Sequence, residues 1–184
     1  MIRRWVRSAG RLALVRDARA DALHEWRRRL GGEPELPRGH IRNVTVVCHG
    51  NICRSPFAAA LLEREYGGLT VRSAGFAATD GRPADPSAVR AAARFGVVLD
   101  AHAARRLSAE DVAWADLVLA MEGHHVARIR AVLRAGGRKT RLLGGFLPAP
   151  SFTIGDPFGR SDEVFAATFE RIALAVRRLA ARIP

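Results

Sequence analysis

Apolar residues follow two different spacings along the chain. Before residue 31 they recur every three or four positions, which predicts one amphipathic helix that ends at Gly31 and Gly32. From residue 44 onward, short apolar or β-branched runs alternate with Ala-rich and Leu-rich segments. This alternation predicts a parallel sheet with crossover helices on both faces. The predicted strands are 44–48, 69–74, 116–121 and 140–143, and the predicted helices are 56–66, 87–95, a short one from 108, and 124–135.

The segment from Val44 to Pro56 reads V-T-V-V-C-H-G-N-I-C-R-S-P. It predicts a strand that stops at Cys48, a tight loop, and a helix that Ser55 caps and whose first turn holds Pro56. Gly50 allows the backbone to curl closely, so that successive peptide N–H groups form an anion-binding hollow. The start of the following helix adds a positive dipole end to the same hollow.

These surroundings favour the thiolate form of Cys48, and a thiolate is a nucleophile. Arg54 offers a planar fork that can hold two phosphate oxygens at once. The alternative is that Cys48 is a buried strand-end thiol and Arg54 a solvated charge. The full run G-N-I-C-R-S-P between a strand and a helix favours phosphate chemistry.

From about residue 43 to 182 the chain resembles the low-molecular-weight protein tyrosine phosphatases, whose signature loop reads very nearly C-x-G-N-I-C-R-S-P. The resemblance implies an α/β three-layer sandwich with a central four-stranded parallel sheet, flavodoxin-like in topology. It implies hydrolysis through a phosphocysteine on Cys48, with Ser55 donating to the sulfur and no metal or cofactor. It also implies that the loop residues between Cys48 and Arg54 bind substrate: His49, Gly50, Asn51, Ile52 and Cys53.

Two further segments resemble elements that support the family's loop. In S-A-G, the resemblance implies that Ser73 hydrogen-bonds Asn51, and in H-A-A-R-R-L it implies that His102 supports the same asparagine. Without the resemblance, Ser73 is a small polar residue at a strand end and His102 a surface or structural histidine.

A proton donor for the leaving group is expected from I-G-D-P-F-G-R. The proline after Asp156 stiffens its loop, and the resemblance implies that Asp156 is the general acid and that Phe158 walls the ring slot. An ordinary turn and ordinary packing are the alternatives for these two residues. The resemblance further implies that Cys53 can pair with Cys48 on oxidation, whereas the alternative for Cys53 is a buried loop residue.

Two positions depart from the family pattern: His49, where an aliphatic or small residue is usual, and Ala78, near where several members place an aromatic wall. Among other enzymes of this fold, thiol-coupled arsenate reductases need cysteines that this chain lacks, and phosphoarginine phosphatases carry threonine in place of Ile52. The Asp-Pro loop resembles bacterial members, which implies a phosphotyrosine protein, with a bacterial tyrosine kinase as candidate partner.

The 184 residues carry a net charge of +12, and residues 1–43 contribute half of it. We expect a basic amphipathic extension with its linker at 1–39 and a phosphatase domain at 40–184. Only two cysteines are present and the longest apolar run of the extension is too short for a signal peptide, which indicates a cytoplasmic protein.

The extension has two interpretations. Its apolar face either packs on the domain or on a second subunit, or residues 1–30 contact an anionic membrane or a partner protein. Nucleic acid is a less favoured partner, and the oligomeric state is not determined by the sequence. If the extension is the functional part, the chain would be a phosphate-binding regulatory module rather than an enzyme.

Overall fold

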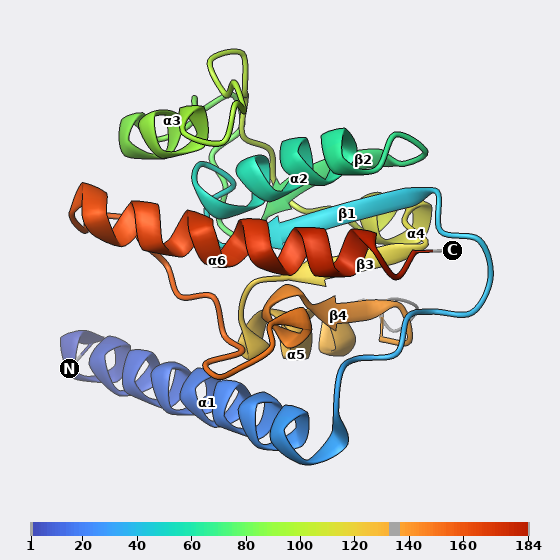
Figure 1. The fold of residues 1–184 in the computed structure, drawn as a ribbon. Coiled ribbons are helices and arrows are strands. Elements are labelled where there is room, and N and C mark those ends of the chain that lie inside the picture. Colours follow the sequence, from blue (N-terminus) through green and yellow to red (C-terminus); the bar gives the residue numbers. More distant parts are fainter. Residues whose placement is uncertain (1, 133–136, 184) are drawn as a thin grey trace.

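Four parallel strands form one sheet at the centre of the molecule (Figure 1). The computed structural model describes the backbone of residues 2–132 and 137–183, and the side chains of 16–131 and 137–183. The predicted four-stranded parallel sheet is confirmed, in the order β2-β1-β3-β4. The strands are β1 (Asn43–Cys48), β2 (Thr70–Gly75), β3 (Leu117–Ala120) and β4 (Thr140–Leu142).

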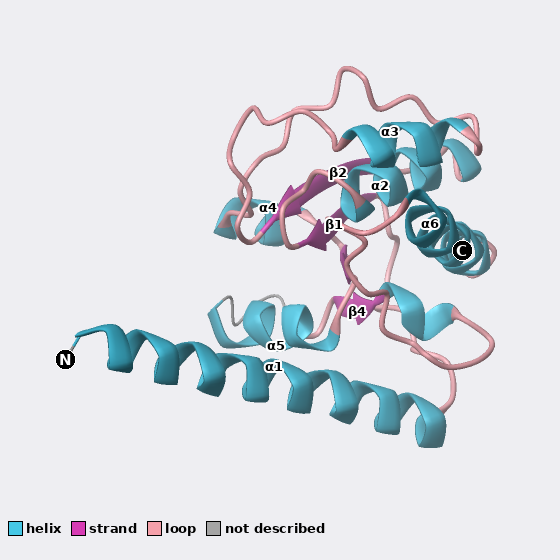
Figure 2. Ribbon diagram, turned by 90° about the vertical axis from the view of Figure 1, so that its left-hand side faces the viewer, coloured by secondary structure: helices cyan, strands magenta, loops and turns pink. Residues whose placement is uncertain are grey.

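Helices cover both faces of this sheet, which gives the predicted three layers (Figure 2). On one face lie α2 (Arg54–Glu65), α3 (Pro86–Ala93) and α6 (Asp162–Ala180), and on the other α4 (Ala109–Trp114) and α5 (Gly123–Val132). A short 3₁₀ helix, η2 (Leu143–Phe146), follows β4. The end of the predicted helix 124–135 lies outside the described residues.

The interior is built around β1 because it has a paired strand on each side and helices above and below. Val44, Val46 and Val47 are fully buried, as a central strand of a parallel sheet requires. The rings of Phe57 on α2 and Phe169 on α6 stack with centroids 4.3 Å apart. This contact fixes α2, and therefore the loop before it, against the C-terminal helix.

Two local predictions have different outcomes. The predicted short helix from 108 is confirmed as α4, and Ser108 and Asp111 form a complete capping box at its start. The prediction that Ser55 caps α2 is wrong, because the helix already begins at Arg54 and Cys53 occupies the cap position. The Ser55 hydroxyl faces the sulfur of Cys48 instead of a backbone amide.

The N-terminal helix α1 (Ile2–Gly31) lies along the outer side of α5, and its first turns extend past the rest of the molecule (Figure 2). Asp21 accepts hydrogen bonds from the backbone N–H of His124 at 2.9 Å and from its ring at 3.2 Å. The Glu25 carboxylate accepts from the Thr153 amide at 2.7 Å. At Gly123 a Cβ would lie 2.8 Å from the Ala20 carbonyl, so the two helices meet backbone to backbone.

The prediction that the Leu/Trp face of this helix packs on the domain is therefore wrong for the described residues. Leu23, Trp26 and Leu30 are 43%, 59% and 70% exposed. The surface beneath α1 offers backbone amides and carbonyls, which need polar partners, so the polar face of the helix is buried there. Among the described residues no helix is long and apolar enough to cross a membrane.

The contact between Asp21 and His124 depends on pH. The hydrogen bond to Asp21 raises the pKa of His124, with Glu122 and Asp17 adding to it against the effect of burial. Burial alone would raise the pKa of Asp21, but its hydrogen bonds with His124 lower it overall. The stability that comes from the lowered pKa of Asp21 is fully present above about pH 3.8 and is lost on acidification. The stability that comes from the raised pKa of His124 is fully present below about pH 6.5 and is lost as pH rises through the folded pKa of His124.

We expect Asp21→Asn to lower the free energy of unfolding by about 1–3 kcal/mol, because a charged hydrogen-bond acceptor is removed from a partly buried pair. The difference from the unmodified protein should be largest between about pH 4 and 6.5 and should shrink at higher pH. Thermal unfolding across this pH range measures it. Asp17→Asn breaks the more exposed pair with Arg128 and should cost about 0–1 kcal/mol. Equal losses, or a pH-independent difference, would contradict this assignment.

Candidate active site

The sulfur of Cys48 lies at the carboxyl end of β1, where the chain turns into a tight loop before α2. Its Sγ is 3.0 Å from the Ser55 hydroxyl oxygen and accepts from the Asn51 amide at 3.3 Å. The side-chain amide of Asn51 donates to the same hydroxyl oxygen at 2.9 Å. The hydroxyl proton of Ser55 can then point at the sulfur, 3.0 Å away, or at the Ala74 carbonyl, 3.4 Å away, and the sulfur is the nearer acceptor.

Four carbonyls of the loop accept hydrogen bonds from groups outside it. A trans peptide directs its N–H opposite to its C=O, so the amides of residues 49, 50, 52 and 53 are turned toward the inside of the loop. Within the described part of the chain, these four amides have no hydrogen-bond acceptor. They form the predicted anion-binding hollow. The outward pairs are Cys48 with Phe76, His49 with Ala77, Ile52 with Asp85, and Asn51 with His102, at 3.2, 2.9, 2.8 and 2.7 Å.

Asn51 holds the loop in this shape. Its φ is +54°, a left-handed conformation that asparagine tolerates better than most residues. Its side-chain amide also donates to Ser73 at 2.9 Å, and its side-chain oxygen accepts from the Arg105 backbone N–H at 2.9 Å. The predicted contacts of Ser73 and His102 with Asn51 are confirmed.

Arg54 is 1% exposed and carries the positive charge of the site. One terminal nitrogen donates to Glu122 at 2.6 Å and to the Ile154 carbonyl at 2.8 Å, and the other lies 2.8 Å from Asp156. Burial alone would lower the pKa of Arg54, but the charges of Cys48, Asp156 and Glu122 raise it. Its Nε is buried without a partner among the described residues, so a donor remains for a ligand oxygen.

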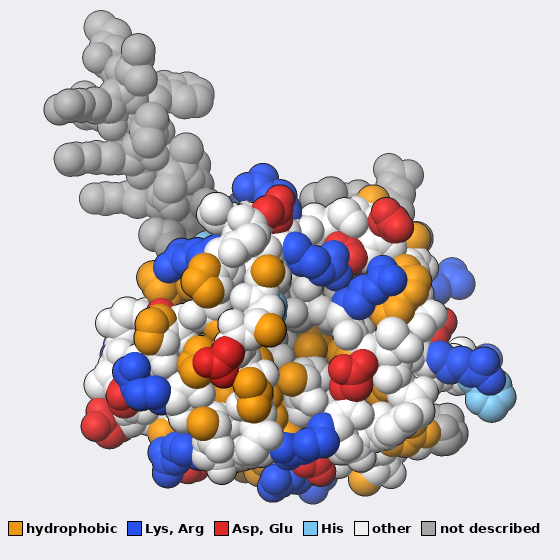
Figure 3. Space-filling view, turned by 90° about the horizontal axis from the view of Figure 1, so that it is seen from above, with side chains coloured by type: hydrophobic (Ala, Val, Ile, Leu, Met, Phe, Trp, Pro, Cys, Tyr) orange, Lys and Arg blue, Asp and Glu red, His pale blue; other side chains and the backbone are white. Residues whose placement is uncertain are grey.

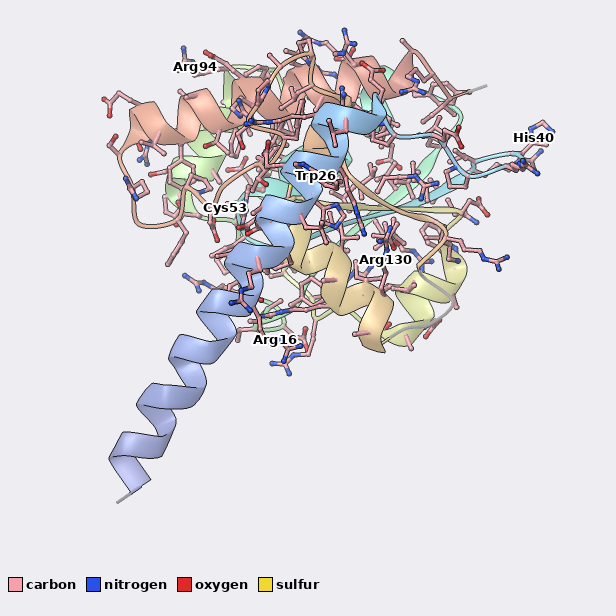
Figure 4. All side chains as sticks on the ribbon, turned by 90° about the horizontal axis from the view of Figure 1, so that it is seen from below. Arg16, Trp26, His40, Cys53, Arg94 and Arg130 are labelled. Atoms are coloured by element: carbon pink, nitrogen blue, oxygen red, sulfur yellow. The ribbon has the colours of Figure 1, made fainter. Side chains whose placement is uncertain are left out.

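A pocket of about 260 Å³ opens above the sulfur. Phe158 is half exposed at its rim, and the Arg82 guanidinium lies 5.5 Å from the centre of that ring. Cys53, which Figure 4 labels, is one of the residues that line this pocket. The pocket is lined by Cys48, His49, Gly50, Ile52, Cys53, Ala77, Arg82, Asp156 and Phe158.

Residues 43–184 match the family described as low molecular weight phosphotyrosine protein phosphatase. The chain belongs to this family. Escherichia coli K12 Etp, a low molecular weight protein-tyrosine-phosphatase, is 38% identical over 143 residues, which span 78% of this chain and 95% of Etp. Etp is therefore matched along nearly its whole length, whereas the N-terminal extension of this chain lies outside the match.

Solved structures of the family show the same fold. The tyrosine phosphatase Wzb from E. coli K30, in complex with sulphate, has a TM-score of 0.74 and 33% identity over 78% of this chain and 99% of Wzb. The YwlE arginine phosphatase from Geobacillus stearothermophilus has a TM-score of 0.72 and 35% identity, covering 77% of this chain and 92% of YwlE. The fold is therefore shared by a tyrosine phosphatase and an arginine phosphatase.

Several residues at this phosphatase site were not predicted. Glu122 directly follows the predicted strand 116–121, so the rule that parallel strands present ligand-facing groups at their carboxyl ends could have found it. Arg82 and Ala77 lie in irregular segments and give no local signal. Ala78, predicted to lie near the position of an aromatic wall, is itself buried, and its neighbour Ala77 lines the pocket.

Cys53 lines the pocket as predicted, but its electrostatic setting differs from that of a reactive thiol. Burial raises the pKa of Cys53 strongly, and the charges of Asp85, Asp156 and Cys48 raise it further. The group is therefore a neutral thiol in the resting protein. Its predicted part as a redox partner of Cys48 stays a prediction.

A cluster of potential metal ligands lies behind Arg54. The ligand atoms of Glu122, His124 and His125 are all within 4.8 Å of one another. Burial, His124 and Arg54 lower the pKa of His125 to about 2, and its ring stacks on Phe76 at 5.1 Å. With Glu122 already paired to a buried guanidinium, the surroundings disfavour a cation. The cluster acts as packing and support for the arginine.

Gly75 lets β2 pass directly beside the loop. A Cβ at this position would lie 2.7 Å from the His49 carbonyl oxygen and 2.8 Å from the Asn51 nitrogen. Because backbone atoms cannot move aside easily, we expect Gly75→Ala to displace the loop and to cost about 1–3 kcal/mol of stability. Hydrolysis of p-nitrophenyl phosphate and thermal unfolding measure both effects. Gly67→Ala, where a Cβ meets nothing within 4 Å, is the control, and equal activity of the two variants would contradict the expectation.

Proposed function

We propose that this protein hydrolyses phosphotyrosine in proteins through a phosphocysteine intermediate on Cys48. The observation that carries the proposal is the arrangement around one sulfur: inward-facing amides and the Ser55 hydroxyl below it, and the paired Arg54 and Asp156 across the pocket. This arrangement matches a trigonal phosphoryl group whose equatorial oxygens need donors on every side.

In the first step the Cys48 thiolate attacks phosphorus, and the bond from phosphorus to the aryl oxygen breaks. The loop amides and Arg54 hold the equatorial oxygens, with the free Nε as one donor. Asp156 gives its proton to the departing phenoxide, so the products of this half-reaction are a neutral phenol, an aspartate and the phosphocysteine.

In the second step the Asp156 carboxylate takes a proton from water, which attacks phosphorus while the sulfur leaves as a thiolate. The Ser55 hydroxyl, 3.0 Å from Sγ, donates to the departing sulfur and stabilises its charge. Asp156 lies on an exposed loop and is 2.8 Å from Arg54, so the negative substrate competes with it for the guanidinium.

The substrate slot supports an aryl ester. Phe158 offers an aromatic wall, and Ile52 lines the pocket below it. Arg82 beside the Phe158 ring adds a positive charge at the rim that suits acidic residues flanking a phosphotyrosine. We therefore propose a phosphotyrosine protein as substrate, with a bacterial tyrosine kinase as the candidate. Similarity to the arginine phosphatase YwlE keeps phosphoarginine as the second candidate substrate.

Cys48→Ser should abolish turnover of p-nitrophenyl phosphate, because a serine hydroxyl in this loop is a far weaker nucleophile than a thiolate. Cys53→Ser keeps the nucleophile and should retain most of the activity, which makes it the control. Steady-state hydrolysis and detection of a phosphorylated cysteine by rapid quenching measure the two. A Cys48→Ser variant with unchanged turnover would rule out the proposed intermediate.

Asp156→Asn should slow turnover by roughly 10²–10⁴ on a phosphotyrosine peptide, whose phenoxide needs a proton to leave. The loss should be smaller on p-nitrophenyl phosphate, because nitrophenoxide leaves without help. The ratio of the two losses measures general acid catalysis itself. Losses of equal size on both substrates would mean that Asp156 holds the loop rather than donating the proton.

A substrate comparison tests the class of phosphoester directly. We expect kcat/KM for phosphotyrosine peptides to exceed that for phosphoserine and phosphoarginine peptides of the same flanking sequence. The physical reason is the aromatic wall of Phe158, so Phe158→Ala should reduce the preference for phosphotyrosine over phosphoserine. A higher kcat/KM for the phosphoarginine peptide would mean that phosphoarginine, and not phosphotyrosine, is the substrate. The phosphocysteine mechanism would still hold.

A further inference from the structure

The outer surface of α1 combines three exposed apolar side chains with arginines that have no acidic partner among the described residues. Leu23, Trp26 and Leu30 follow each other at spacings of three and four and form one stripe, which we call the apolar stripe. Seven large apolar side chains are exposed among the described residues, and three of them belong to this stripe. The other four are scattered over the rest of the surface: Val98, Phe158, Val164 and Leu174.

Charge on this helix is sorted between its two sides. The three acids of the described part face the domain and are paired: Asp17 with Arg128, Asp21 with His124, and Glu25 with residues 151 and 153. The exposed side carries arginines beside the apolar stripe and none of the helix's acids. These exposed arginines are Arg16, Arg19, Arg27 and Arg29.

The positive surface continues into a hollow of about 380 Å³ between the end of α1, α5 and β4. Its lining holds two acids, Glu33 and Glu35, and Glu33 is paired with Arg178 and Arg182 outside the hollow. The arginines of the lining outnumber these acids: Arg27, Arg28, Arg130 and Arg141. Arg27 and Arg130 have no acidic partner within the described chain. Burial and Arg130 lower the pKa of Arg141 while Glu35 opposes them, and burial, Arg130 and Arg27 lower the pKa of His24. An anion placed beside Arg27 and Arg130 would relieve the repulsion between these cations.

The opposite side of the molecule differs. Figure 3, which looks onto the face away from α1, shows acidic and basic side chains interspersed. Figure 4, from below, shows Trp26 on α1 with Arg130 on the neighbouring α5. Apolar side chains and arginines without an acidic partner in the described part of the chain thus lie together on the underside of the molecule.

We propose that the apolar stripe and the arginines around it bind the surface of a membrane rich in anionic phospholipids. An amphipathic helix with Trp and Leu on one face and arginines at its borders lies in the lipid interface, with the apolar side chains below the headgroups. The hollow beside Arg27 and Arg130 receives a headgroup phosphate. Each arginine near an anionic surface strengthens binding by about five-fold.

Other occupants fit the charges less well. A second copy packed stripe to stripe would bring the same arginines against each other across the interface. A nucleic acid would use the arginines and leave Leu23, Trp26 and Leu30 in water. An anionic lipid surface satisfies both sets of side chains together.

The geometry keeps the active site open in the bound state. In Figure 2 the carboxyl ends of the strands face the viewer while α1 lies beneath, so a membrane under α1 leaves the pocket facing sideways. Activity on a small soluble ester should therefore be unchanged by vesicles. Bound protein would reach phosphorylated residues held close to the membrane.

The test is co-sedimentation of the full chain with vesicles of phosphatidylcholine alone or mixed with phosphatidylglycerol. Binding is expected only with the mixed vesicles and should weaken as salt rises. Leu23→Glu should reduce it by roughly ten-fold or more, because a charge replaces an inserted apolar side chain. Leu174→Glu on α6 is the matched control, since the two leucines are 43% and 45% exposed on helices, and it should bind normally.

Arg27→Gln and Arg130→Gln should each weaken binding by about five-fold. Arg94→Gln should not, because Arg94 ends α3, which lies on the side of the molecule away from α1 (Figure 1). All variants should hydrolyse p-nitrophenyl phosphate like the unmodified chain, which shows that they are folded. Three results would overturn the proposal: no binding to mixed vesicles, equal loss in Leu23→Glu and Leu174→Glu, or a dimer in light scattering that Leu23→Glu dissociates. The last would identify the stripe as an interface between copies of this chain.

Discussion

The structure depends on one buried positive charge. The guanidinium of Arg54 is almost fully removed from water, which is costly unless opposite charges and acceptors surround it. Those partners come from separate parts of the chain: Cys48 at the end of β1, Glu122 after β3, and Asp156 in the loop before α6. Satisfying this group brings three segments to one point, and that point is the catalytic pocket.

The need of buried polar groups for partners also explains why groups outside the Cys48 loop form so many hydrogen bonds with it. Every carbonyl turned outward needs a donor, and the residues just after β2, the residue before α3 and the segment at His102 supply them. The left-handed Asn51 is stable because both ends of its side-chain amide are bonded. Among the described residues, the loop amides without an acceptor are those that face the sulfur. These amides form the binding site for the phosphoryl group.

The N-terminal helix is joined to this network at its edge. Asp21 binds the first turn of α5, directly after Glu122, and the His124 ring lies 3.9 Å from the Glu122 carboxylate. The helix therefore rests on the residues that hold Arg54, while its apolar stripe faces away from the domain. Together with the contacts of Glu25 and Arg28, this polar contact orients the helix so that its arginines and its tryptophan share one exposed side.

The spacing of apolar residues is enough to predict the parallel sheet, and the contiguous run G-N-I-C-R-S-P is enough to predict the loop around Cys48. The contacts of Ser73 and His102 were expected only from the resemblance to the family, and so was the role of Asp156, which stays a proposal. An apolar repeat through Phe165, Phe169 and Ile172 is the local signal that could have predicted α6. The contacts of Glu122 and Arg82, the start of α2 before Ser55 and the buried face of α1 have no such local signal, because they depend on segments that are distant in the chain. A periodic pattern predicts that a helix has two faces, but the face that packs depends on the polarity of the surface it meets, and that surface is assembled from residues far away in the chain.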